Sequence, residues 1–309
     1  MTAPFHERLL DWYDLHGRKD LPWQHDITPY NVWLSEIMLQ QTQVSTVIPY
    51  YLRFITQYAD INALASAKLD DILALWTGLG YYARARNLHK AANILVRHHQ
   101  AKMPFSIDEL IALPGIGRST AGAIMSLAHQ KKHPILDGNV KRVLARHSAI
   151  SGWPGKKPVE QKLWGIAESL LPEKRIAHYT QAQMDLGATV CKRNKPLCLQ
   201  CPLHEDCKAF QLGTPELFPT SKPRKEILTH QIRWLIAQSD NGEILLEQRP
   251  TNGIWGGLWS FPEFDSLTDL AYFSQEKLKV NPEEIQHQTS IRHVFTHFKL
   301  DITPYLVHS

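Results

Sequence analysis

Residues 113–117, Leu-Pro-Gly-Ile-Gly, constrain the fold of this chain more than any other stretch. A short helix should end at Leu113, because Ser106 and Glu109 have capping-box spacing and Pro114 cannot extend a helix. The two glycines then permit backbone conformations that other residues avoid, so a tight hairpin can present bare N–H groups where the next helix begins. The run predicts a helix–hairpin–helix unit that binds an anion such as a phosphate. An ordinary helix–helix turn is the alternative.

Two carboxylates are candidates for catalysis. Asp137 stands at the expected start of a helix, with Gly138 leaving room for a ligand, although a plain helix cap is the alternative. Glu36 lies inside an expected helix, one turn after Val32 and Trp33, so apolar surface should raise its pKa. A solvated surface glutamate is the alternative there. A raised pKa is what a general acid needs, and a helix N-terminus beside Asp137 could separate the pKa values of the two carboxyls.

The period of the apolar residues divides the chain into two parts. Helical patterns cover residues 5–16, 29–39, 46–58, 68–76, 84–98 and 156–190, and a basic, Pro-rich stretch follows to about residue 225. Beyond it Ile232, Trp234 and Ile236 alternate, a turn lies at 240–242, and the return through Ile244 suggests a β-hairpin. We therefore expect a mainly α part followed by a smaller α+β domain.

The charge is divided in the same way. Residues 1–225 carry 28 Lys and Arg against 19 Asp and Glu, whereas residues 226–309 carry 6 against 11. A basic N-terminal part suggests a polyanionic partner. No run of eighteen apolar residues occurs, and the N-terminus lacks the apolar core of a signal peptide. We expect a soluble, cytoplasmic monomer without membrane contact, associated with the nucleoid if the source is a bacterium.

All four cysteines fall in one short segment, at Cys191, Cys198, Cys201 and Cys207. Such clustering indicates a metal site before a disulfide framework. Structural zinc sites more often use two close pairs, whereas four thiolates from one compact loop suit a [4Fe–4S] cluster. The intervening cations either contact a phosphate backbone or serve solubility: Lys192, Arg193 and Lys195.

Two glycines precede the pair Tyr81-Tyr82, and this loop should push an aromatic ring outward. In a DNA-binding protein such a ring wedges between base pairs, and packing of both tyrosines in the core is the alternative. Cations on the next helix should contact phosphates or be solvated: Arg84, Arg86, Lys90 and Arg97.

These motifs together resemble the helix-hairpin-helix glycosylases of the endonuclease III superfamily, and specifically adenine DNA glycosylases of MutY type. The resemblance extends from residue 5 to about 300. Its specific parts are residues 34–42, 78–87, 113–121, 137–146 and the cysteine spacing. It implies a six-helix barrel over 23–134, a [4Fe–4S] helical domain over 1–22 and 135–210, a linker over 211–228, and a Nudix-like lesion-recognition domain over 229–309 that is incomplete at its end.

The resemblance also implies the reaction and the roles of residues. Adenine mispaired with 8-oxoguanine or guanine in double-stranded DNA would be excised in base excision repair. Glu36 would protonate N7 of adenine and later activate water, Asp137 would stabilise the oxocarbenium ion or trap it covalently, and Asn139 would orient the site. The implied adenine pocket consists of Trp23, Gln24 and Gln181. The implied DNA contacts are Gln41, Thr42, Tyr81, Leu113, Gly115, Gly117, Lys192, Arg193 and Lys195, and 8-oxoguanine would meet Phe295, Thr296 and His297.

Ser119 departs from the bifunctional members of this superfamily, which carry a lysine nucleophile there. A serine has no amine for a Schiff base, so we expect a monofunctional glycosylase with little or no lyase activity. The alternatives are an endonuclease III-like enzyme for oxidised pyrimidines and a noncatalytic iron–sulfur DNA-binding protein. Nucleotide hydrolysis by the second domain is not expected, because the acidic Nudix box does not follow Pro262.

Overall fold

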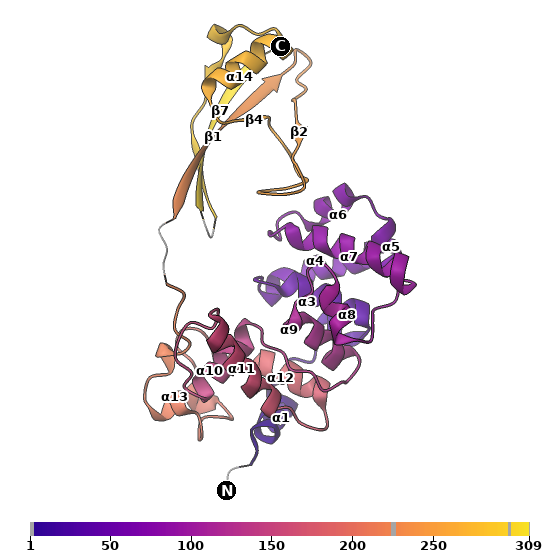
Figure 1. Ribbon diagram of the computed structural model, residues 1–309, viewed down its shortest axis with the longest axis vertical. Helices are drawn as coiled ribbons and strands as arrows, with labels where there is room; N and C mark the ends of the chain where they lie inside the picture. Colours follow the sequence, from indigo (N-terminus) through magenta and orange to yellow (C-terminus); the bar gives the residue numbers. More distant parts are fainter. Residues whose placement is uncertain (1–2, 224–226, 296–297, 309) are drawn as a thin grey trace. The chain divides into compact units, whose positions relative to one another are not determined.

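The computed structural model describes residues 3–223, 227–295 and 298–308, and the chain forms two compact units, Met1–Lys222 and Pro223–Ser309. The first unit is helical and the second contains the β-strands (Figure 1). This confirms the expectation of a mainly α fold with a smaller strand-containing domain. No helix in the described residues has both the length and the apolar character needed to cross a membrane.

The first unit is built from helices joined by short loops. Its helices are α1 (Phe5–His16), α2 (Pro22–His25), α3 (Pro29–Leu39), α4 (Val44–Gln57), α5 (Ile61–Ser66), α6 (Leu69–Trp76), α7 (Ala83–His99), α8 (Ile107–Ala112), α9 (Arg118–Ala123), α10 (Gly138–His147), α11 (Lys157–Ser169), α12 (Ile176–Thr189) and α13 (Lys208–Gln211). A π-helical turn (Ile124–Ala128) continues α9, and 3₁₀ turns span Cys198–Gln200 and Pro215–Leu217.

Local signals account for most of these helices. Thr28 caps α3, because its Oγ1 accepts a hydrogen bond from the backbone N–H of Asn31 at 3.1 Å. Ser106 also precedes α8, but its side chain makes no capping hydrogen bond, so the predicted capping box is wrong. The predicted helix over 156–190 is two helices, since Pro172 lies between them and Arg175 adopts a left-handed backbone with φ 60°.

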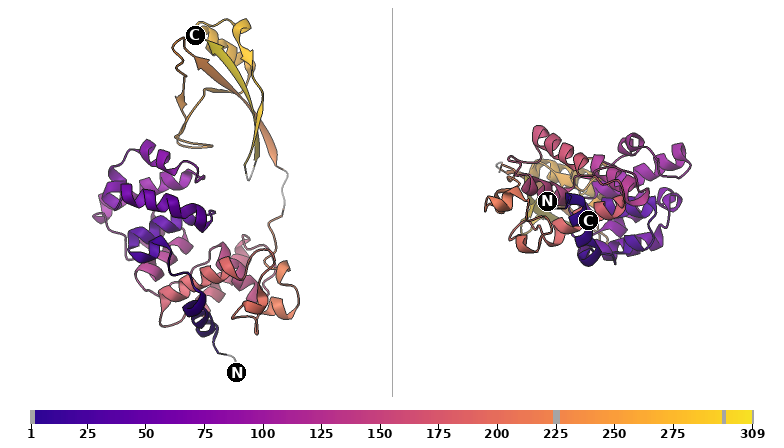
Figure 2. Two further views of the ribbon diagram at one scale, coloured as in Figure 1. Left: turned by 180° about the vertical axis from the view of Figure 1, so that it is seen from behind. Right: turned by 90° about the horizontal axis from the view of Figure 1, so that it is seen from below.

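The N-terminal helix packs on the last helices of this unit. A buried core joins residues of α1 to residues of α10, α11 and α12, with Phe5, Leu9, Leu144, Leu163 and Tyr179 among its members. Both figures show α1 in indigo beside these helices (Figures 1 and 2). The chain therefore crosses from one helical group to another within the few residues between α1 and α2.

The second unit centres on two long strands, β1 (Leu228–Gln238) and β7 (Phe298–His308), which run parallel along their whole length. β4 (Glu263–Phe264) pairs with the other side of β1, whereas β5 (Gln286–His287) and β6 (Ile291–Val294) pair with β7. The short strands β2 (Glu247–Gln248) and β3 (Trp259–Ser260) form a separate ribbon, and α14 (Leu267–Phe273) covers β1.

The predicted hairpin after β1 is reduced to one bridge, between Gln238 and Ile244. Its turn does form, because the backbone N–H of Gly242 donates to the Ser239 carbonyl at 2.8 Å. The returning segment does not continue as a strand along β1. β1 instead takes β7 and β4 as neighbours, which are more than twenty residues away in sequence, so tertiary pairing overrides the local signal.

Candidate active site

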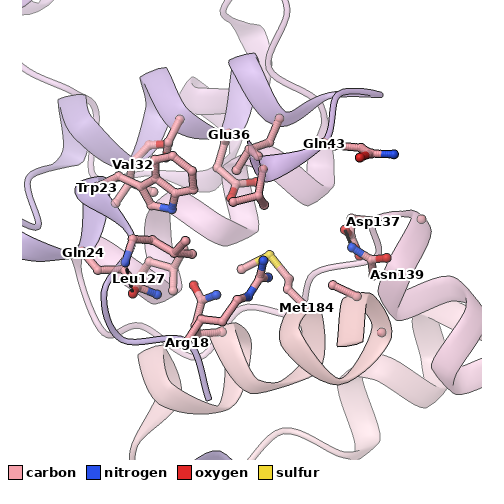
Figure 3. Close-up of a pocket in the computed structure, with 18 of the residues that line it drawn as sticks. Arg18, Trp23, Gln24, Val32, Glu36, Gln43, Leu127, Asp137, Asn139 and Met184 are labelled. Carbon is pink, nitrogen blue, oxygen red and sulfur yellow. Dashed lines mark hydrogen bonds between the residues drawn. The ribbon is translucent and has the colours of Figure 1, made fainter. Parts of the chain in front are cut away.

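A cleft of about 1060 Å³ brings together most of the side chains that the sequence singled out. It is bordered by α2, α3, the turn after α3, the starts of α9 and α10, and one side of α12 along most of its length (Figure 3). The predicted residues that line it are Trp23, Gln24, Glu36, Gln41, Thr42, Ser119, Asp137, Asn139, Gln181, Lys192 and Arg193. Those that do not line it are Tyr81, Leu113, Gly115, Gly117 and Lys195.

Glu36 lies on α3 at the floor of this cleft, where the protein surrounds its carboxyl group but solvent still reaches the side chain. Removal from bulk water, and next the negative charge of Asp137, raise the pKa of Glu36 to about 8. No hydrogen-bond donor contacts the carboxyl within the described residues. The expectation of an apolar environment is confirmed, and the neutral acid is the main form at pH 7.

Asp137 is the N-cap of α10, and it also lines the cleft. Its Oδ1 accepts a hydrogen bond from the backbone N–H of Val140 at 2.7 Å, and Asn139 Nδ2 lies 3.4 Å from Oδ2. Burial raises the pKa of Asp137. These hydrogen bonds and the charge of Arg142 lower it, but they offset only part of the increase. The helix start does lower the pKa of Asp137 through the Val140 N–H, but desolvation is the larger influence. Only Asp137 of the two carboxyls has donors that favour the ionised form.

Ser119 and Asn139 position Asp137. The Ser119 hydroxyl accepts a hydrogen bond from the backbone N–H of Leu136 at 2.9 Å, which fixes the residue before Asp137. Asn139 is held in turn by Arg142, whose Nη2 donates to its Oδ1 at 2.8 Å. Gly187 on α12 permits this arrangement, because a Cβ there would lie 2.6 Å from the Asn139 Cβ.

The predicted adenine pocket forms the opposite end of the cleft. Trp23 is buried with its ring edge-on to Tyr51 at 5.4 Å, and Gln181 is 5% exposed. Figure 3 shows Trp23 and Gln24 on one side, Asp137 and Asn139 on the other, and Glu36 between them. Glu36 thus lies between the predicted base pocket and Asp137 in this view.

The predicted phosphate-binding hairpin lies beside the end of α3, outside the cleft lining. Gly115 has φ +82°, which requires glycine, and its carbonyl lies 3.4 Å from Gln40 Nε2. Gly117 adopts an extended backbone with φ −91° and caps α9, so the expectation of special backbone freedom at Gly117 is wrong. Nothing lies within 4 Å of a Cβ at Gly117, and the open space leaves the start of α9 accessible.

Gln41 and Tyr81, which were predicted to enter the duplex, both have left-handed backbones, with φ 59° and 51°. Such conformations are unfavourable for non-glycine residues and concentrate at functional sites. Tyr81 is 46% exposed, so the alternative in which both tyrosines pack in the core is wrong.

Arg84, which was expected to contact phosphate or solvent, is instead buried behind these two loops. Its guanidinium donates to the carbonyls of Ile37, Met38 and Gln40 at the end of α3, and to those of Leu79 and Gly80 before Tyr81.

Sequence reasoning assigned Arg84 the wrong role, and it missed Arg142 and the ion pair between Arg18 and Asp185. The Arg18 guanidinium lies 2.7 Å from the carboxylate of Asp185, which is fully buried. The partners are 167 residues apart. Arg84 and Arg142 likewise bind carbonyls of distant segments, those of Met38 and Gly187. A basic residue before the Leu-Pro-Trp segment was visible, but its partner was not.

The four cysteines line one small cavity with Arg146, which donates to Cys191 Sγ at 3.3 Å. Burial raises the pKa of the Cys201 thiol to about 12. No group of three or more His, Cys, Asp or Glu in the described residues is arranged to hold a metal ion. A single zinc requires four ligands around one point, whereas a four-iron cluster binds each thiolate on a different iron. The donor set and its cavity therefore fit the cluster better than zinc.

The three cations of the first cysteine loop are exposed, and two of them, Lys192 and Arg193, line the cleft. Lys195 does not line the cleft, and its backbone N–H donates to Glu216 Oε1 at 3.3 Å. Arg146 holds this loop through the carbonyls of Lys192 and Arg193.

Of the residues expected to recognise 8-oxoguanine, Phe295 lies in the second unit and stacks on Phe298 with ring centroids 4.5 Å apart. Trp255 and His293 also lie against its ring, at 5.3 and 4.4 Å. Thr296 and His297 lie outside the described residues.

Comparison with known proteins identifies the two units separately. Residues 34–169 match the model of the HhH-GPD superfamily base excision DNA repair proteins, and residues 233–309 match the NUDIX domain. Among solved structures, a thermostable thymine-DNA glycosylase is 26% identical, with a TM-score of 0.60 over 67% of this chain and 95% of that chain. An endonuclease III–DNA complex has the same fold at 21% identity, with a TM-score of 0.58 over 67% and 94%.

Relatives cover nearly the whole chain. An adenine DNA glycosylase of Buchnera aphidicola (subspecies Acyrthosiphon pisum) is 43% identical over 98% of this chain and 86% of that protein. The adenine DNA glycosylase of Homo sapiens is 34% identical over 98% of this chain and 67% of that protein. Identity at this level and coverage, across both units, shows the family: the chain belongs to the adenine DNA glycosylases, enzymes of base excision repair.

Proposed function

We propose that this enzyme excises adenine paired with 8-oxoguanine or guanine, with Glu36 as the general acid and Asp137 as the group that stabilises the sugar cation. The proposal rests on one observation. Two carboxyl groups line the same cleft, and hydrogen-bond donors contact only one of them. A dissociative cleavage of a glycosidic bond needs this asymmetry, because it uses one proton donor and one anion.

Glu36 supplies the proton. Its raised pKa keeps the carboxyl neutral at physiological pH, and it then protonates N7 of the bound adenine, which makes the base a better leaving group. The resulting carboxylate activates the water that attacks the sugar.

Asp137 meets the positive charge that develops on the sugar. Its orientation is fixed by the Val140 N–H and by Asn139, so little reorganisation accompanies the reaction. Ser119 supports this segment through Leu136 and has no amine, so no imine forms at this position and strand cleavage is not part of the reaction.

The base reaches the cleft by rotating out of the duplex. Trp23, Gln24 and Gln181 hold it, Gln41 fills the gap that it leaves, and Tyr81 wedges beside the opposite base. Thr42, Leu113 and the N–H groups at Gly115 and Gly117 contact the DNA backbone, together with Lys192, Arg193 and Lys195. The substrate is a double-stranded duplex, and the enzyme acts as a monomer inside the cell.

The family is of the endonuclease III type, which generally contains iron–sulfur. Cys191, Cys198, Cys201 and Cys207 would hold a [4Fe–4S] cluster, whose contribution when bound is to fold the loop that carries the cations. We assign residues 1–22 and 135–210 to this cluster domain, 23–134 to the six-helix barrel, and 211–228 to the linker. The second unit, with Phe295, Thr296 and His297, recognises the oxidised guanine.

The test uses duplexes with adenine opposite 8-oxoguanine, guanine or thymine, and a duplex with thymine glycol. We expect adenine release from the first two, with strand breakage only after alkali, and no borohydride-trapped complex. Release of thymine glycol with spontaneous breakage supports an endonuclease III-like specificity instead. Glu36→Gln and Asp137→Asn should each abolish excision while mismatch binding remains. Full activity in either variant would show that its carboxylate role is misassigned.

A further inference from the structure

One fully buried carboxylate beside the cleft has no part in the chemistry described above. Asp185 on α12 accepts hydrogen bonds from four N–H groups of two residues. Its Oδ2 accepts from the backbone N–H of Arg18 at 2.8 Å, and its Oδ1 accepts from Arg18 Nε and Nη2 at 2.9 and 2.7 Å. The fourth donor is Gln181 Nε2, 2.8 Å from Oδ1. A carboxyl with four donors is an acceptor only.

This arrangement fixes which way the Gln181 amide points. An amide has a donor end and an acceptor end, and only the donor end can face a carboxylate. With Nε2 held at Asp185, Oε1 is directed away from it. Oε1 has no hydrogen-bond partner in the described part of the chain and does not belong to its buried unpaired atoms. Since Gln181 lines the cleft, this oxygen faces the space in which the base would lie.

The same carboxylate holds the other wall of the pocket. Arg18 lies between α1 and α2, and Figure 3 places it below Trp23 and Gln24, which follow it in the chain. Arg18, Trp23, Gln24 and Gln181 all line the cleft. Asp185 thus ties the segment that carries Trp23 and Gln24 to the helix that carries Gln181.

We propose that Asp185 is a positioning residue that determines which base the pocket accepts. It holds the Gln181 oxygen as a hydrogen-bond acceptor toward the base, which matches the exocyclic amine of adenine and opposes the carbonyl oxygen that guanine or hypoxanthine carries at the same position. The inference rests on the proposed adenine pocket. It deepens that proposal, because it names the group that gives Gln181 its polarity.

The experiment compares two bases opposite 8-oxoguanine in otherwise identical duplexes: adenine, and purine, which lacks only the exocyclic amine. Single-turnover kinetics give the ratio of the adenine excision rate to the purine excision rate, both for the unmodified protein and for Asp185→Asn. The asparagine side chain keeps the shape of aspartate but adds an N–H donor. The Gln181 amide can then turn its oxygen toward residue 185 and its NH2 group toward the base. We expect the adenine-to-purine ratio to fall about tenfold, the value of one hydrogen bond made to the base. The intrinsic reactivity of the two bases cancels in this comparison.

Two further variants separate polarity from docking. Arg18→Met leaves Gln181 bound to Asp185, so it should slow both bases alike and keep the ratio. Gln181→Met removes the acceptor, so it should lower the ratio as much as Asp185→Asn does, and the double variant should lower it no further. A purely structural role for Asp185 would change both rates together and leave the ratio unmoved.

An unchanged ratio in a folded Asp185→Asn protein overturns the proposal. If circular dichroism shows that this variant does not fold, Gln181→Met decides, and a ratio equal to that of the unmodified protein overturns the proposal equally. The carboxylate roles are tested separately, because Glu36 and Asp137 are intact in every variant. If Glu36→Gln loses excision while Asp185→Asn keeps the adenine-to-purine ratio, the roles of the two catalytic carboxyls stand. Only the positioning role of Asp185 is then refuted.

Discussion

Replacement of Glu36 by glutamine should make the protein inactive and more stable. The pKa of this carboxyl rises from 4.5 in the unfolded chain to about 8 in the folded protein. A raised carboxyl pKa means that the folded state binds the proton more tightly, so stability is full below pH 4.5 and falls as the pH rises toward 8. Each pH unit in this window lowers the free energy of unfolding by about 1.4 kcal/mol.

The loss at pH 7 is about 3 kcal/mol on this reasoning, and about 2 kcal/mol after allowance for the solvent that enters the cleft. Glutamine has the shape of the neutral acid and never ionises, so Glu36→Gln escapes this loss. For a helical unit of this size the variant should melt about 4–8 °C higher at pH 7, and only about 1–2 °C higher near pH 5. The gain would be an instance of an active site that lowers the stability of its protein.

Thermal melting of the holo protein at pH 5, 6, 7 and 8, followed by circular dichroism at one scan rate, measures the difference. Glu7→Gln on the exposed face of α1 is the matched control, and it should show no such dependence on pH. A Glu36→Gln protein that melts at the same temperature as the unmodified protein from pH 5 to 8 would falsify the argument, because the carboxyl would then not be desolvated.

Three further outcomes follow from the same site. The single-turnover excision rate should fall about tenfold per pH unit above pH 8 as Glu36 loses its proton, and it should also fall at acid pH as Asp137 takes one up; a rate that rises above pH 8 contradicts the acid role. Gly187→Ala should reduce excision by tenfold or more, since its Cβ would lie 2.6 Å from the Asn139 Cβ, whereas Gly165→Ala, with nothing within 4 Å, should keep full activity and gain about 0.5–1 kcal/mol in stability. Arg84→Met should weaken duplex binding by at least tenfold in a gel-shift titration, because the carbonyls that it holds support both loops predicted to enter DNA; unchanged affinity would show that the loops need no such support.

Local patterns determined the helical architecture and most of the candidate site. The first helix and α3 were predicted with their observed bounds, because cap residues, glycine stops and apolar periodicity act within one or two turns. Glu36 and Asp137 were singled out by their positions on expected helices together with the family resemblance, and the structure places both at one cleft. The cysteine spacing located the cavity that the four thiols line.

What the sequence did not determine lies between distant segments. The partners of β1 were missed because strand pairing in the second unit is non-local and overrides a good turn. Arg84 was expected on the surface because its sequence neighbours give no sign of the carbonyls at the end of α3, 44 or more residues earlier, to which it donates.

By itself, therefore, the sequence located the helices and the candidate catalytic side chains on them, because hydrogen-bond caps, turns and residue types are properties of short segments. The tertiary structure alone decided what surrounds them. Burial raises the pKa of both carboxyls, and it outweighs the helix start at Asp137. Asp185 meets Arg18 across 167 residues. Desolvation and long-range hydrogen bonds depend on every neighbour in space, and no spacing along the chain records them.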